Sequence, residues 1–139
     1  MSYIKVSDEA IRSLEETRTG KRFRYMIFGF SNDERFINLI KEEGPDANLN
    51  DFINDLPDND VAYGYYSFNF KDNDGNDRSR MILFHWAPSS SPGKKKMMLS
   101  MSWQTIKNVL PGVVISYQCS SKDIITENLL QEKCLFQIH

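Results

Sequence analysis

Apolar and polar residues along the chain follow two periods, one typical of strands and one typical of helices. Five segments are rich in aromatic and β-branched side chains and are predicted to be strands: residues 22–30, 35–40, 61–70, 78–86 and 113–119. We expect the first two to form a hairpin and the next two to form a longer hairpin. The tip of the longer hairpin, residues 71–77, is polar and contains the turn signal Asp74-Gly75, so it is expected to protrude.

Other segments show helical signals. Ser7, Asn50 and Thr126 are predicted to cap three short helices, the first of which opens the fold and the last of which runs to residue 135. Residues 92–110 are predicted to form the longest helix. Because this helix connects the strands at 78–86 and 113–119, those two strands are expected to be parallel. The sequence therefore predicts an α/β fold in which helices sandwich a mixed sheet of about five strands.

Composition limits the size, the location and the class of partner. With 139 residues, of which 40% are hydrophobic and 26% charged, residues 1–139 are expected to form a single domain. No apolar run approaches the roughly 18 to 20 residues of a membrane span, and the N-terminus lacks a signal-peptide pattern, so we expect a cytoplasmic protein. The net charge of −2 argues against nucleic acid as a partner bound by bulk phosphate neutralisation.

Residues suited to catalysis or metal binding are sparse. Cys119 and Cys134 stand in no CxxC arrangement and are expected to be buried free thiols. His85 lies inside an apolar strand and His139 ends the chain, so neither has a local nucleophile or metal-ligand spacing. The loops are rich in acidic residues that we interpret as turn formers and solvating charges: Asp55, Asp58, Asp60, Asp72, Asp74 and Asp77. The sequence therefore indicates neither an enzyme nor a bound metal or cofactor.

The predicted helix over residues 92–110 has two faces of different character. The face expected to lie on the sheet contains Met98, Ser102, Ile106 and Val109, flanked by Leu99 and Leu110. The opposite stripe contains Met97, Met101, Gln104 and Asn108, with Lys94, Lys96 and Lys107 around it. Outward methionines with lysines at the rim suit insertion into a groove on another protein. The alternative is that neighbouring loops cover the methionines or that they are scattered on the surface.

A second candidate surface lies near the base of the longer hairpin. Arg78 and Arg80 are two residues apart in a predicted strand, so their side chains point to the same face. They would present a paired positive surface to an acidic partner. The alternative is an ordinary solvated pair on an edge strand.

Several strings of residues carry a resemblance to a known family. They are Phe52-Ile53-Asn54-Asp55-Leu56-Pro57, the aromatic strand at 63–70, and Trp86-Ala87-Pro88 followed by Ser91-Pro92-Gly93-Lys94-Lys95-Lys96-Met97-Met98. Over nearly the whole chain, the element order and these strings resemble the ADF/cofilin family. The resemblance implies an ADF-homology fold with a mixed five-stranded sheet. It also implies a protein that binds actin monomers and filaments, prefers their ADP form and severs or depolymerises filaments.

The resemblance further implies roles for individual residues. Contacts with both actin forms are expected from Ser2, Tyr3, Lys94, Lys96, Met97, Met101, Gln104 and Lys107. Contacts with filaments alone are expected from Arg78, Arg80, Glu132 and Lys133. Phosphorylation of Ser2 is expected to switch binding off. Phosphatidylinositol bisphosphate is expected to bind Lys94, Lys95, Lys96 and Lys107, and the protein is expected to be monomeric.

The chain also departs from the family pattern. Trp103 stands where the family usually has lysine, Asn108 replaces a basic residue, and Gln104 stands where an acid is common. The lost positive charges are expected to weaken lipid binding and electrostatic steering more than apolar actin contact. Two alternatives therefore stay open. One is a monomer-sequestering protein with weak severing, against which the full-length hairpin tip argues, and the other is a phosphoinositide-binding signalling module.

Overall fold

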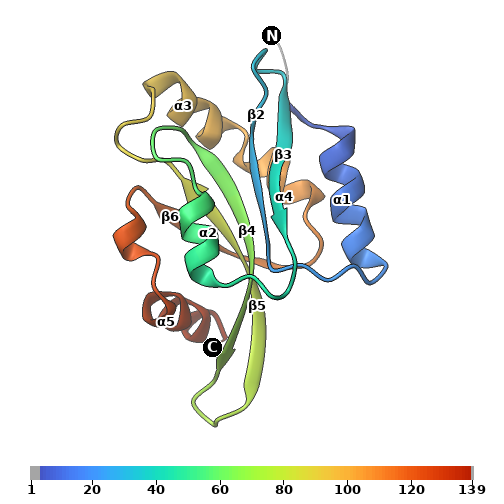
Figure 1. The fold of residues 1–139 in the computed structure, drawn as a ribbon. Helices are drawn as coiled ribbons and strands as arrows, with labels where there is room; N and C mark the ends of the chain where they lie inside the picture. Colours follow the sequence, from blue (N-terminus) through green and yellow to red (C-terminus); the bar gives the residue numbers. More distant parts are fainter. Residues whose placement is uncertain (1–3, 139) are drawn as a thin grey trace.

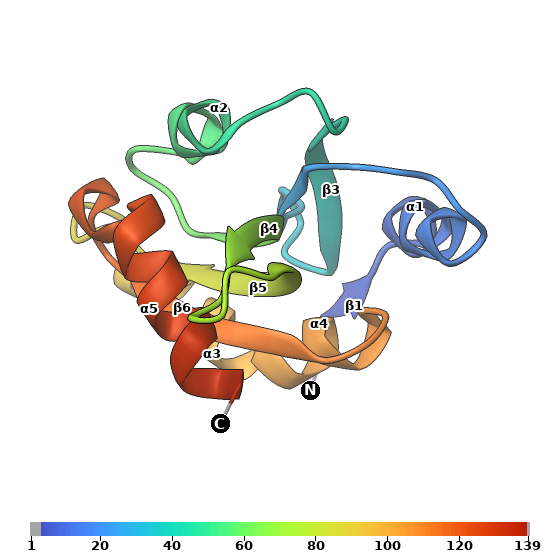
Figure 2. The same ribbon diagram turned by 90° about the horizontal axis from the view of Figure 1, so that it is seen from below.

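The computed structural model describes residues 4–138, which form a mixed sheet with helices on both faces (Figures 1 and 2). The strands are β1 (Lys5–Val6), β2 (Tyr25–Phe30), β3 (Phe36–Glu43), β4 (Ala62–Lys71), β5 (Asp77–Trp86) and β6 (Val114–Cys119). The helices are α1 (Asp8–Arg18), α2 (Leu49–Asp55), α3 (Gly93–Met101), α4 (Trp103–Val109), the 3₁₀ helix η1 (Lys122–Ile124) and α5 (Glu127–Ile138). The predicted α/β sandwich is confirmed.

The strands lie across the sheet in the order β1-β3-β2-β4-β5-β6. Both predicted hairpins are antiparallel pairs, and β6 runs parallel to β5, as the long crossover predicts. The sheet has six strands rather than about five, because β1 pairs in parallel with the start of β3. The expectation that a helix opens the fold is therefore wrong. A strand of two residues is too short to show alternation in the sequence.

The two faces of the sheet bury separate apolar clusters. Along β4, Tyr63 and Tyr65 face the side covered by α1, α3 and α4, whereas Tyr66 packs with residues of α2 and α5. Cys119 and Cys134 are buried free thiols in the second cluster, as predicted. Burial raises the pKa of Cys119 to about 12 and that of Cys134 to about 11, so both stay protonated and unreactive at neutral pH.

The predicted helix over residues 92–110 is divided at Ser102 into α3 and α4. The backbone of Ser102 lies at φ −96° and ψ 4°, outside the helical range. The carbonyl of Leu99 is the group to which the N–H of Trp103 would donate in a continuous helix. That carbonyl accepts a hydrogen bond from the hydroxyl of Tyr63 on β4. The insertion of a side-chain donor into the helical ladder explains the break.

The helix starts follow local hydrogen bonds. Ser7 caps α1 by accepting from the N–H of Ala10, and Thr126 accepts from the N–H of Leu129 at the start of α5, as predicted. The predicted cap at Asn50 is wrong because Asn48 caps α2. The side chain of Asn48 accepts from the N–H of Asp51, and the Asp51 carboxylate accepts from the N–H of Asn48. This reciprocal pair requires a polar acceptor three residues after the cap, and the residue three after Asn50 is Ile53.

Strand β4 passes directly beneath α2 at Gly64. A Cβ atom at residue 64 would lie 2.5 Å from Cζ of Phe52, whose ring is fully buried. We expect Gly64→Ala to lower the free energy of unfolding by about 1–3 kcal/mol, measured by urea denaturation. Gly44→Ala is the matched control, since a Cβ there meets nothing within 4 Å. Equal losses in the two variants would contradict the packing argument.

Candidate functional site

The outer sides of α3 and α4 form the first candidate surface, which we call the helix surface. Its members are Lys94, Lys96, Met97, Met101, Gln104 and Lys107. Met97 is 63% exposed and Met101 is 74% exposed, so the alternative that loops cover them is wrong. On the opposite side of the same helices, Leu99 and Ile106 are fully buried. The two helices therefore keep one buried and one exposed side despite the break at Ser102. The apolar strip formed by Met97 and Met101 faces solvent.

The lysines that begin α3 are held by neighbouring groups. Lys94 forms an ion pair of 2.9 Å with Glu34 in the turn between β2 and β3. Lys96 donates to the carbonyl of Ser89 over 3.1 Å, and Nζ of Lys95 lies 5.9 Å from the centre of the Phe30 ring. These contacts fix the positive rim of the helix surface. Sequence reasoning missed Glu34, which is 60 residues away from Lys94 and shares no motif with it.

The structure also shows where Trp103 points. Its ring lies 6.0 Å from that of Tyr63 and 5.5 Å from that of His85, so it packs partly buried against the sheet. Trp103 is therefore not part of the exposed stripe. Gln104, in contrast, is exposed and donates to the side chain of Asn108 over 2.8 Å.

His85 has one polar neighbour of interest. Its Nε2 atom lies 3.4 Å from Oγ of Ser100, and burial lowers the pKa of His85. Among the described residues no carboxylate bonds to His85, so the third member of a Ser-His-Asp site is missing there. Between residues 4 and 138, no group of three or more His, Cys, Asp or Glu residues is arranged to hold a metal ion. None of the helices described combines the length and apolar character needed to cross a bilayer.

The second candidate surface, which we call the hairpin surface, combines β5 with α5. Its members are Arg78, Arg80, Glu132 and Lys133. Arg78 is exposed and pairs in register with Phe70 of β4, while Arg80 is half-buried and pairs with Phe68. Helix α5 is joined to the other strand of the hairpin, because Nε2 of Gln131 donates over 3.2 Å to the carbonyl of Lys71, the last residue of β4. Glu132 is exposed and Lys133 is half-buried, and their predicted roles stay predictions.

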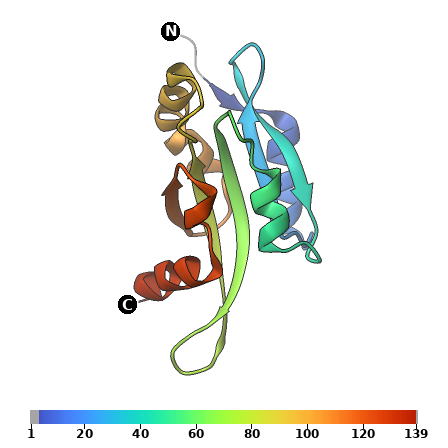
Figure 3. The ribbon, with the colours of Figure 1, turned by 60° about the vertical axis from the view of Figure 1, so that its left-hand side comes forward.

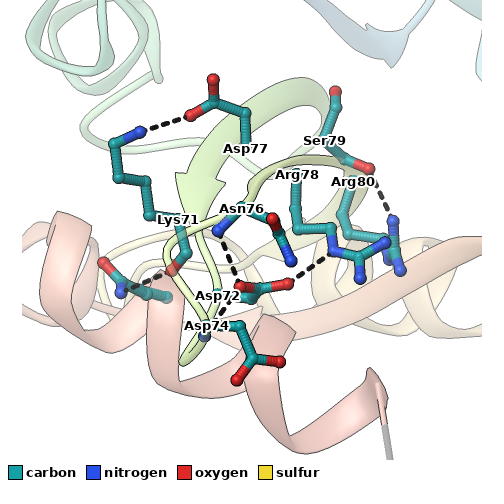
Figure 4. Close-up of polar contacts among 9 residues, drawn as sticks. Lys71, Asp72, Asp74, Asn76, Asp77, Arg78, Ser79 and Arg80 are labelled. Carbon is teal, nitrogen blue, oxygen red and sulfur yellow. Dashed lines mark hydrogen bonds and ion pairs between the residues drawn. The ribbon is translucent and has the colours of Figure 1, made fainter.

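The tip beyond this surface is ordered by Asp72 (Figure 4). Its Oδ1 atom accepts from the N–H groups of Asp74 and Asn76, each over 2.9 Å, and Oδ2 accepts from Nε of Arg78 over 2.8 Å. The bond from Arg78, followed by the N–H of Asn76, lowers the pKa of Asp72 to about 2. The interpretation of Asp72 as a turn former is confirmed. The interpretation of Asp72 as a solvating charge is wrong, because its side chain is only 9% exposed and forms an ion pair with Arg78. The sequence alone does not show this pair, since it depends on the register of the hairpin.

The two surfaces lie at opposite ends of the molecule (Figures 1 and 3). Helix α3 is near one end, and the tip between β4 and β5 projects at the other. The structure therefore keeps the two surfaces apart. Ser2 and Tyr3, predicted to belong with the helix surface, lie outside the described residues.

Comparison of the sequence with known proteins identifies related proteins over nearly the whole chain. A model described as "Cofilin/tropomyosin-type actin-binding protein" matches residues 3–135. Actophorin from Acanthamoeba castellanii is 31% identical over 133 residues, which cover 96% of each chain. Cofilin from Saccharomyces cerevisiae is 31% identical over 119 residues, which cover 84% of this chain and 82% of the yeast protein.

Solved structures agree with the fold. The crystal structure of Streptomyces griseoflavus cofilin superimposes with a TM-score of 0.82 at 21% identity, covering 94% of this chain and 96% of that one. At this identity the likeness supports the architecture, while the family model and the two relatives carry the assignment. Together they show that the chain belongs to the ADF/cofilin family of actin-binding proteins.

Proposed function

We propose that this protein binds actin monomers and actin filaments and promotes filament turnover in the cytoplasm by severing and depolymerising filaments, with preference for ADP-actin. The observation that carries the proposal is the outward pair Met97 and Met101 on a helix whose other side is buried. Exposed methionines on one stripe with lysines at its rim suit an interaction site. Membership of an actin-binding family supplies the partner.

The helix surface is proposed to contact actin in both its forms. Met97 and Met101 supply polarisable, adaptable area that fits an apolar groove. Lys94, Lys96 and Lys107 supply positive charge at the rim, where it speeds encounter with an acidic partner and sets orientation. Gln104 adds a polar contact on the same side. This arrangement needs binding alone, with neither a cofactor nor a covalent step.

The hairpin surface is proposed to contact a second actin subunit, as occurs only in a filament. Its basic residues Arg78 and Arg80 lie at the end of the molecule remote from α3, so one molecule can touch two successive subunits. Glu132 and Lys133 on α5 are proposed to extend the same contact. A molecule bound between subunits would change the filament twist, and boundaries between decorated and bare segments would then break.

Two forms of regulation are proposed for the helix surface. Phosphorylation of Ser2 would add about −1.5 to −2 charges next to an acidic actin surface and would therefore oppose binding. Phosphatidylinositol bisphosphate would bind Lys94, Lys95, Lys96 and Lys107 through salt-sensitive contacts. In the free protein Lys94 is paired with Glu34 and Lys96 with the carbonyl of Ser89, so a lipid headgroup would have to displace both.

A phosphoinositide-binding signalling module is the second candidate function. It is favoured by the three consecutive lysines at the start of α3. Against it, residues 103 and 108 farther along the helices are the uncharged Trp103, which packs inward, and the uncharged Asn108. Vesicle sedimentation against actin co-sedimentation at physiological salt separates the two functions, since the signalling module requires tighter binding to vesicles.

The first prediction concerns the two methionines. Met97→Ala combined with Met101→Ala is expected to weaken binding to both actin forms about tenfold or more, because central apolar contacts dominate protein interfaces. Stability should change by less than about 0.5 kcal/mol, since both side chains are exposed. Monomer binding is measured by fluorescence titration and filament binding by co-sedimentation. Ile40→Ala on β3, where the side chain is 61% exposed, is the matched control. Undiminished monomer binding by the double variant would refute the helix surface.

The second prediction separates the two surfaces. Arg78→Ala combined with Arg80→Ala is expected to reduce filament co-sedimentation about tenfold and to leave monomer binding unchanged, since both residues are remote from α3. The control is Arg12→Ala combined with Lys41→Ala, which removes two exposed positive charges elsewhere. Normal filament binding by the Arg78 and Arg80 variant would show that the filament contact lies elsewhere.

A further inference from the structure

The carboxylate of Asp72 offsets positive charge next to the two arginines of the hairpin surface, which would weaken attraction to an acidic partner. Asp72 lies next to Arg78, and its side chain is only 9% exposed. We infer that Asp72 is a positioning residue of the hairpin surface, which fixes the tip and the direction of Arg78 before a filament is bound. The inference rests on the proposed filament binding and names a residue that acts through another.

The first support is the number of hydrogen bonds that Asp72 makes. Its two carboxylate oxygens accept three of them, from the N–H groups of Asp74 and Asn76 and from Nε of Arg78. Its own N–H donates to the carbonyl of Asn76, and its carbonyl accepts from the N–H of Gly75. Gly75 has a φ of 82°, which glycine adopts without strain. Asp72 therefore takes part in five hydrogen bonds that order the tip.

The second support is the way in which Arg78 is held. Only Nε of its guanidinium is bonded to Asp72, and the side chain is 44% exposed. Among the described residues the two terminal nitrogens have no hydrogen-bond partner. A guanidinium fixed at Nε presents its terminal N–H groups in a defined direction, which suits recognition of a carboxylate. Figure 4 shows Asp72 and Arg78 joined in this way.

The third support is the link between the tip and α5. Gln131 of α5 donates to the carbonyl of Lys71, the residue directly before Asp72. The hydrogen bonds of Asp72 and Gln131 thus connect the two elements that form the hairpin surface. A surface ordered in advance loses less conformational entropy when it binds. Positioning therefore accounts for a carboxylate that electrostatic attraction alone would not favour.

The decisive variant is Asp72→Asn. The asparagine carbonyl can still accept from Asp74 and Asn76, so the turn is kept, but the asparagine amide places a donor against the Nε donor of Arg78. The variant also makes the surface more positive, and attraction to an acidic partner alone would then strengthen filament binding. Positioning predicts the opposite result, a loss of filament affinity of about fivefold with monomer affinity unchanged.

Asp77→Asn is the matched control because it makes the same change of charge in the same hairpin. Asp77 pairs with Lys71 over 2.7 Å, but both side chains are largely exposed, and the Arg78 side chain bonds to Asp72 rather than to either of them. Filament affinity should not fall in this variant. The inference is overturned if Asp72→Asn binds filaments as tightly as the wild type or more tightly, or if it loses monomer and filament affinity equally.

A measurement without actin tests the positioning itself. In Asp72→Asn the NMR signal of the Arg78 Nε–H should shift and exchange faster with water, whereas in Asp77→Asn it should not. With the pKa of Asp72 held near 2, the carboxylate stays ionised between about pH 5 and about pH 8. The chemical shift of the wild-type Arg78 Nε–H should therefore stay constant over this range. An unchanged Arg78 signal in Asp72→Asn would overturn the inference. A wild type that fails to co-sediment with filaments would instead overturn the proposed function.

Discussion

The burial of one side of α3 and α4 against the sheet is the constraint on which the candidate surfaces depend. Leu99 and Ile106 are completely buried among residues of β2, β4 and β5. Rotating either helix to hide Met97 or Met101 would expose these residues, and burying one aliphatic side chain is worth about 1.5–3 kcal/mol. The methionines therefore face solvent because the opposite side is committed to the core. Partner binding is the interaction that would remove them from water.

The break at Ser102 adjusts this arrangement without destroying it. The Tyr63 hydroxyl bonds to the carbonyl of Leu99, and the same tyrosine ring packs against Trp103. One residue of β4 thus interrupts the helix and receives the bulky side chain that follows the interruption. Since Trp103 is turned inward, it offers no charge and little area to a partner. In the proposed contact with actin, the apolar strip would then contribute more than basic residues along α4.

Local rules predicted those parts of the fold that depend on neighbours in sequence. The strand runs, the Ser7 and Thr126 caps and the two-sided pattern around Met97 all follow from spacing within a few residues. The rest depends on contacts between distant residues, which spacing does not encode. The break at Ser102 requires Tyr63, and the pair between Lys94 and Glu34 requires the turn after β2. Asp72 and Arg78 are only six residues apart, but their ion pair can be predicted only once the register of the hairpin is known.

Strand β5 gives the two surfaces a mechanical connection. It begins next to Arg78 at the tip, ends at Trp86 and leads directly into the loop before α3. Its ten residues span about 30 Å, and it is paired along its length with β4 and, from Met81 onward, with β6. Hydrogen bonds to neighbouring strands restrain β5 more than a loop would be restrained. If the two surfaces contact successive subunits, a rigid connection forces the filament rather than this protein to adapt. That is the physical requirement for changing filament twist by binding alone.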